Sequence, residues 1–281
     1  MLGRLPRRGT IIACAAGVAG SYAYCAAPNH RTQTIFSWGQ LVPSAAAHDV
    51  AAEEKAPVLV SFWKERGLQL KLVSHGATHA AAVDDKGGLW VWGEASGPTP
   101  RKLPCASSLR CLASTRSSLY ATTQRGEVLQ WSELNVRLSS GEPIEPIKMR
   151  GDLSQVTATS IAGGDDHVLV VGSRGEVVGF GDNSRGQLGL GEPSLARADE
   201  PKRLPLRASA IAAACGHAHS LLLLSDGSCL SFGDDRNLQL GLRATSVKAL
   251  REGASSVHSP QPVSLIGGRV TAIAAGGGGV E

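Results

Sequence analysis

The chain has 281 residues with 34 glycines, which fits one globular domain with many turns. Its net charge of +4 comes from residues 1–31, which contain Arg4, Arg7, Arg8 and Arg31 and no acidic side chain; the rest of the chain is neutral, with 24 basic and 24 acidic residues. This neutrality argues against nucleic-acid binding, because neutralisation of phosphates supplies most of the affinity of such proteins.

Residues 1–31 are interpreted as a targeting segment. Gly9 to Asn29 carries no charged side chain, and as a helix these residues would span roughly 31 Å, just enough for a bilayer core of about 30 Å. A mitochondrial presequence, with or without an inner-membrane anchor through residues 9–29, is the favoured interpretation. The alternatives are a secretory signal cleaved near Ala23 or Ala27, or a disordered tail.

Residues 41–71 read as a helical insertion. Ser44 to Ala56 has a helix-forming composition, with Ser44 as a candidate N-cap and Pro57 beyond its end. The following apolar run, Val58 to Trp63, predicts a strand that enters the first complete repeat.

The rest of the chain is organised around a repeated unit. Its clearest copy is Ile161 to Leu190, with an apolar run, a Ser-Arg-Gly turn, a return strand and a glycine-rich exit loop. Further copies and two fragments indicate that one supersecondary unit recurs. The copies are Leu72–Gly97, Cys111–Leu134 and Ile211–Leu242, and the fragments are Thr34–Leu41 and Val270–Val280.

The copies share the pattern A-G-G-x-x-H, a turn, W/F-G-x-N and G-Q-L-G-L-G, which resembles the regulator of chromosome condensation repeat over about residues 34–281. The resemblance implies an all-β fold, a β-propeller whose relatives have seven blades. Here it implies about four blades plus a fifth split between Val270–Val280 and Thr34–Leu41. We therefore expect an incomplete, open ring over residues 32–281, and a chain that is a truncated or partial product.

Two segments depart from the repeat. Residues 132–160 lack the exit loop found at Asn183–Gly191, and we expect a distinct polar surface loop there. Arg243 to Gly253 is expected to form a short helix.

The histidines, acids and cysteines suggest structural roles. His219 aligns with His79 and His167, which favours a hydrogen-bonding residue between strands over a metal site with His217. The acids at 165–166, 182 and 234–235 read as turn residues rather than an acid–base pair. Cys215 and Cys229 flank one hairpin and could face each other as reduced thiols, without zinc-site spacing. Trp38, Trp90, Trp92 and Trp131 are expected to pack in the core.

The sequence carries no catalytic, cofactor-binding or metal-binding signature, so we expect a non-enzymatic protein without a cofactor. The resemblance implies a mitochondrial scaffold that binds a protein partner, in respiratory-complex assembly or organelle translation. The alternative is guanine-nucleotide exchange on a small GTPase, although the β-wedge used by relatives for that activity cannot be placed here. A third possibility is a propeller of the secretory pathway.

Overall fold

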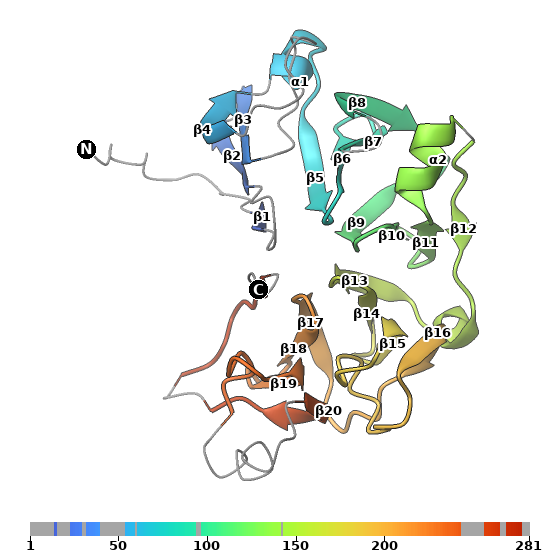
Figure 1. Ribbon diagram of the computed structural model, residues 1–281, viewed down its shortest axis with the longest axis vertical. Helices are drawn as coiled ribbons and strands as arrows, with labels where there is room; N and C mark the ends of the chain where they lie inside the picture. The colour runs from blue at the N-terminus through green and yellow to red at the C-terminus, as the bar shows by residue number, and fades with distance from the viewer. Residues whose placement is uncertain are drawn as a thin grey trace.

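The protein is built from five four-stranded antiparallel sheets arranged as an arc around a central axis (Figure 1). The computed structural model describes residues 61–93, 97–141, 143–242, 256–264 and 268–276, together with the backbone of four strands between residues 14 and 59. Each sheet is a propeller blade whose first strand lies nearest the axis. The predicted β-propeller of the repeat family is therefore confirmed.

We number the blades I to V along the chain. Blade I contains β1 (Cys14–Ala15), β2 (Ala23–Asn29), β3 (Thr32–Gly39) and β4 (Glu54–Leu59), and blade II contains β5 (Leu70–His75), β6 (His79–Asp84), β7 (Leu89–Gly93) and β8 (Gly97–Leu103). Blade III contains β9 (Leu109–Ser114), β10 (Leu119–Thr123), β11 (Val128–Trp131) and β12 (Ile147–Lys148). Blade IV contains β13 (Ala158–Gly163), β14 (His167–Gly172), β15 (Val177–Asp182) and β16 (Arg197–Arg203), and blade V contains β17 (Ala210–Cys215), β18 (His219–Leu224), β19 (Cys229–Asp234) and β20 (Ser256–Pro262).

In the described residues, short helices interrupt this order at three places. They are α1 (Ser61–Glu65), α2 (Leu134–Ser140) and the 3₁₀ helix η1 (Gly151–Gln155). Helix α2 ends at Gly141, whose φ of 74° is the left-handed conformation that commonly closes a helix.

The sequence of a strand reflects its place in the blade. Every residue of β14 is buried, because a middle strand packs against neighbouring blades on both faces, and its apolar run VLVV satisfies both. The outer strand β16 is instead mostly exposed, and only Ala198 and Pro201 are buried in it. The core consequently consists of apolar layers between consecutive blades rather than one central cluster.

The N-terminal predictions need correction. Residues 23–29 form β2, which pairs with β3 in the register Cys25 to Phe36, so the proposed membrane-spanning helix over 9–29 is wrong at least there. In the described part of the chain, no helix has both the length and the apolar character needed to cross a bilayer. The stretch contains few strongly apolar side chains, and pairing of β2 with β1 and β3 satisfies its backbone instead.

The split fifth blade is also wrong. The strand predicted at Thr34–Leu41 is β3, and it pairs with β2 and β4 inside blade I. Residues 268–276 form no strand, although the Val270 amide donates to the Gly227 carbonyl at 2.9 Å, as Ala210 does to Gly175. Blade I is therefore made entirely from N-terminal sequence.

The insertion differs from its prediction as well. Residues 54–56, expected to end a helix, begin strand β4, while residues 44–53 lie outside the described part, as do 243–253. The strand predicted over Val58–Trp63 ends at Leu59, and helix α1 follows. A helical turn lets Phe62 and Trp63 both turn inward against Trp90, whereas consecutive strand residues would face opposite sides.

Candidate functional site

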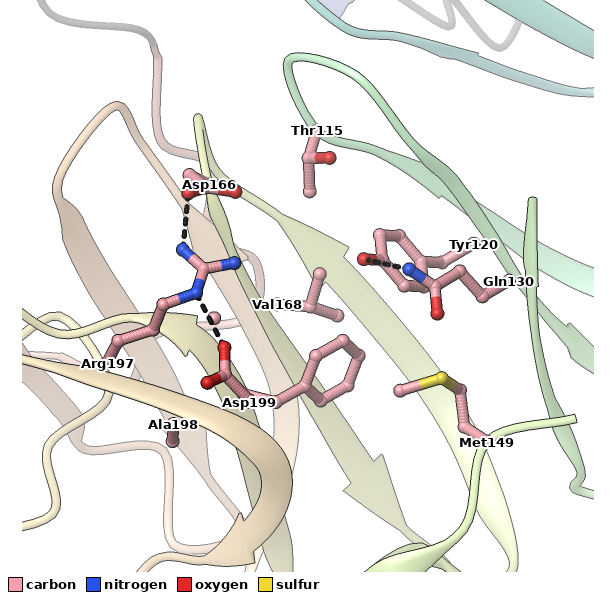
Figure 2. A pocket seen from close by; sticks show the side chains of 11 residues that line it. Thr115, Tyr120, Gln130, Met149, Asp166, Val168, Arg197, Ala198 and Asp199 are labelled. Atoms are coloured by element: carbon pink, nitrogen blue, oxygen red, sulfur yellow. Dashed lines mark hydrogen bonds and ion pairs between the residues drawn. The ribbon is translucent and has the colours of Figure 1, made fainter. Parts of the chain in front are cut away.

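The most distinctive surface feature is a cleft between blades III and IV with a volume of about 90 Å³ (Figure 2). Blade III contributes Thr115, Tyr120 and Gln130, and the segment after β12 contributes Met149. Blade IV contributes Asp166, Val168, Phe180, Gly181, Arg197, Ala198 and Asp199. Pockets for cofactors and drug-sized ligands usually measure about 300–1,000 Å³. This cleft therefore has room for a single side chain.

The cleft has an apolar floor. The rings of Tyr120 and Phe180 meet edge to face with centroids 5.4 Å apart, and Val168 is buried beside them. Gln130 Nε2 donates a hydrogen bond to the Tyr120 hydroxyl at 3.0 Å, which fixes both side chains. Burial raises the pKa of Tyr120, so the hydroxyl stays neutral and the floor carries no charge.

The rim of the cleft is charged. Arg197 Nη1 lies 2.6 Å from Asp166 Oδ2, and Arg197 Nε lies 2.7 Å from Asp199 Oδ1. The hydrogen bonds that Arg197 donates to these two carboxylates raise its pKa, so the guanidinium stays charged. The three groups together carry one negative charge, and their side chains are 50–82% exposed. A cationic group approaching the cleft therefore meets an attractive rim.

A second polar chain links the blades on the same face. Arg116, Asp165 and His217 occupy the same loop in blades III, IV and V, between the first and second strands. Asp165 pairs with Arg116 and lies 3.5 Å from His217 Nδ1, and the Arg116 amide donates to the Asp165 carbonyl at 2.7 Å. The ion pair with Asp165 raises the pKa of Arg116. These loops therefore present a connected row of polar groups.

His167 joins blades IV and V. His167 Nε2 lies 2.9 Å from Ser220 Oγ in blade V, and that hydroxyl donates to the Gln187 carbonyl at 2.8 Å. Because the Ser220 hydrogen is committed to Gln187, His167 donates through Nε2–H. Burial lowers the pKa of His167 to about 3. The predicted structural hydrogen bond is present at His167, but it crosses between blades rather than between strands of one blade. Within the described residues, neither ring nitrogen of the buried His79 has a hydrogen-bond partner.

Close packing around the histidine explains the glycine that lies three residues before it in blades II, IV and V. A Cβ on Gly164 would lie 2.2 Å from His167 Cε1 and 2.5 Å from the Gly216 carbonyl of the next blade. In blade III, Ser118 stands where blades II, IV and V have histidine, and Thr115 stands where they have glycine. Ser118 is smaller than histidine and leaves room, and Thr115, which is larger than glycine, fills it.

The other candidate residues have structural roles. The Ser184 amide donates to Asp182 Oδ1 at 3.0 Å, and the amides of Leu188 and Leu240 donate to Asn183 and Asp235, which confirms the turn interpretation. Among the described residues, no three His, Cys, Asp or Glu side chains gather as a metal site would need. His217 lies in a loop and contacts Asp165, whereas His219 begins β18 and is half-buried.

Cys215 and Cys229 do not face each other. Cys215 is registered with Ser220 at one end of β18, and Cys229 with Leu223 near the other. Each thiol instead bonds a backbone carbonyl, and burial raises the pKa of Cys215 to about 12. Trp92 and Trp131 are fully buried, as predicted, and Trp90 is half-buried with its Nε1 donating to Asp84 at 2.8 Å.

Comparison with known proteins agrees with this architecture. Residues 174–223 and 226–280 match the Regulator of chromosome condensation (RCC1) repeat, and residues 158–187 match a second form of it. Within residues 158–280 the chain carries RCC1 repeats. It is 26% identical over 234 residues to the RCC1 domain-containing protein RUG3, mitochondrial, of Arabidopsis thaliana, covering 74% of this chain and 51% of the relative.

Solved RCC1-type structures share the fold. Prp20p of Saccharomyces cerevisiae superposes with a TM-score of 0.73 at 19% identity, over 94% of this chain and 67% of that one. Human WBSCR16 superposes with a TM-score of 0.70 at 18% identity, over 92% and 68%. The chain spans about half or less of the length of the curated relatives it matches first, so their whole activities are not carried over to it.

The cleft residues were missed by sequence reasoning. Tyr120, Met149, Arg197 and Asp199 belong to no motif, and their proximity depends on the packing of two blades. One usable signal was the absence of the exit loop after Trp131, which marks the junction where the RCC1 repeat is incomplete.

Proposed function

We propose that this RCC1-repeat chain is a non-enzymatic mitochondrial scaffold that binds a protein partner through the face carrying the cleft between blades III and IV. The observation that carries the proposal is the combination of a cleft of about 90 Å³ with an exposed charged rim. Such a cleft is small for a substrate or cofactor, whereas one inserted side chain surrounded by polar contacts is typical of protein recognition.

The charged loops support the same proposal. Ion pairs on an exposed surface add little to stability, so the Arg197 cluster and the Arg116–Asp165 pair contribute little to holding the fold. Loops presented by a rigid scaffold are a common place for binding residues. A protein partner with complementary charge would use these groups for orientation and association rate.

The proposed compartment rests on the N-terminal sequence. Arg4, Arg7 and Arg8 lie in a stretch without acidic residues, as in mitochondrial presequences, and the relative RUG3 is described as mitochondrial. We place the scaffold in respiratory-complex assembly or organelle translation. In this proposal the segment with Arg4, Arg7 and Arg8 carries targeting, and the strands from β1 onward carry the propeller.

The test is affinity capture of the tagged full chain from mitochondria after mild cross-linking. We expect a protein partner in stoichiometric amount whose cross-links map to the face with Arg116, Asp166 and Arg197. A neutralising variant, Arg116→Gln with Arg197→Gln, should capture less partner. Capture of no partner, or acceleration by the chain of nucleotide release from a mitochondrial small GTPase, would contradict a pure scaffold role.

A further inference from the structure

The cleft between blades III and IV corresponds in position to a site that is filled at the next junction. Between blades IV and V, the exit loop after β15 inserts Leu188, which is fully buried among Leu169, Leu222 and Phe232. Leu188 approaches Gly179, where a Cβ would lie 3.2 Å from its Cδ2. The exit loop is thus the element that closes this junction.

The far wall of the two junctions can be compared residue by residue. The exit loop touches Ser220 through the Gln187 carbonyl, Phe232 through Gly189, and Val257 and His258 through Gly186. The strand registers identify the equivalent residues in blade IV. Val168 pairs with Phe180 as Ser220 pairs with Phe232, and Gly181 pairs with Ala198 as Gly233 pairs with Val257. The equivalents are therefore Val168, Phe180, Ala198 and Asp199. All four equivalents line the cleft.

Blade III does not supply a loop to fill this site. After Trp131 the chain forms α2, whose Leu134 and Leu138 are buried in the layer between blades II and III. Arg101 Nη1 donates to the Leu138 carbonyl at 3.3 Å and ties α2 to blade II. The segment that could have closed the junction between blades III and IV therefore packs on the other side of its blade.

The cleft also differs in charge from the filled site. Asp199 stands where His258 lies in blade V, and Asp166 stands where Ala218 lies. With Arg197 they give the rim one net negative charge, above a floor formed by Val168, Phe180 and Met149. The equivalent positions in blade V do without such charges, so the repeat itself does not require them.

We propose that the cleft receives a tight turn of a partner protein that carries one leucine-sized apolar side chain and a neighbouring lysine or arginine. The apolar side chain enters between Tyr120, Phe180 and Met149, and the basic one pairs with Asp166 and Asp199. The partner thus completes the junction as the exit loop does between blades IV and V. This inference rests on the proposed scaffold function and specifies the contact that the scaffold makes.

The test uses a cyclic peptide with the sequence of residues 183–191, NSRGQLGLG, which presents Leu188 and Arg185 in a turn. We expect it to bind the full chain saturably in fluorescence anisotropy. A control peptide that exchanges Leu188 with Ser184 should bind roughly tenfold or more weakly, because its apolar side chain no longer reaches the floor. Absence of saturation by about 1 mM peptide, or equal binding of both peptides, would overturn the inference.

Variants of the chain locate the contact. Met149→Trp should fill the cleft and abolish peptide binding, and Asp166→Asn with Asp199→Asn should weaken it roughly threefold at low salt. Glu200→Gln, an exposed acid one residue from Asp199 that does not line the cleft, should leave binding unchanged. Melting temperatures verify that each variant folds. Unchanged affinity in folded Met149→Trp would contradict the site.

The two proposals fail in different ways. If the scaffold role holds and the cleft is not the contact, folded Met149→Trp still captures the partner from mitochondria. If the scaffold role itself is wrong, the unmodified chain captures no partner, whatever the peptide does.

Discussion

The neutral, buried state of His167 makes the protein sensitive to acid in a way that one substitution can measure. His167 donates through Nε2 to Ser220, and its other ring nitrogen is buried without a hydrogen-bond partner. Protonation would give the ring a positive charge and a second N–H, at that buried nitrogen. The substitution His167→Gln keeps an amide donor for Ser220 and removes the titrating group.

The sign and size of the effect follow from the pKa values. Burial holds the pKa of His167 at about 3 in the folded protein, below its unfolded value of 6.5, so below pH 6.5 the unfolded chain binds more protons. The contribution of neutral His167 to the free energy of unfolding is fully present above pH 6.5 and is lost as the pH falls toward the folded pKa. At about pH 5.5, one unit below the unfolded value, His167 alone should cost about 1–2 kcal/mol.

The assay is urea unfolding of the chain and of His167→Gln at about pH 7.5 and about pH 5.5. Between these values the unmodified chain should lose about 1–2 kcal/mol more than the variant. His217→Gln removes a half-exposed imidazole from the neighbouring blade, and should keep the response of the unmodified chain. Parallel pH responses of the chain and His167→Gln would refute the buried neutral imidazole.

Other substitutions test the packing and the targeting. Leu188→Ala should destabilise the chain by about 2–5 kcal/mol in urea unfolding, because it opens a cavity between blades IV and V. A loss below about 1 kcal/mol would show that the exit loop does not close this junction. Lys148→Gln breaks an exposed pair with Glu127 and should leave the urea unfolding midpoint unchanged. Replacing Arg4, Arg7 and Arg8 by Gln should prevent import into isolated mitochondria, and unchanged import would remove the targeting proposal.

Sequence patterns were most informative where one blade carries all of the information. The apolar run of β14, the turn at Gly175 with its φ of 82° and the buried Phe180 belong to a single hairpin, so their spacing alone indicates a blade. The repetition of that hairpin then predicts a propeller, because a lone blade leaves both faces uncovered.

The rest depends on contacts between distant segments. The strand at Ala23–Asn29 reads as a helix in isolation, because its identity is set by pairing with β3. Helix α1 exists because Phe62 and Trp63 pack on Trp90, which lies in the next blade. The cleft between blades III and IV is open because α2 packs between blades II and III instead. No local sequence pattern predicts this packing.

Photo-crosslinking in mitochondria tests the account most directly. A photoreactive amino acid replaces Asp199 on the rim of the cleft in one full-length chain, and replaces Arg174, an exposed residue in the hairpin at the opposite end of β14, in another. The account predicts a discrete cross-linked protein from position 199 that disappears when Met149→Trp is added, and no such product from position 174. Cross-linking at 174 but not at 199, or a product at 199 that survives Met149→Trp, would contradict it.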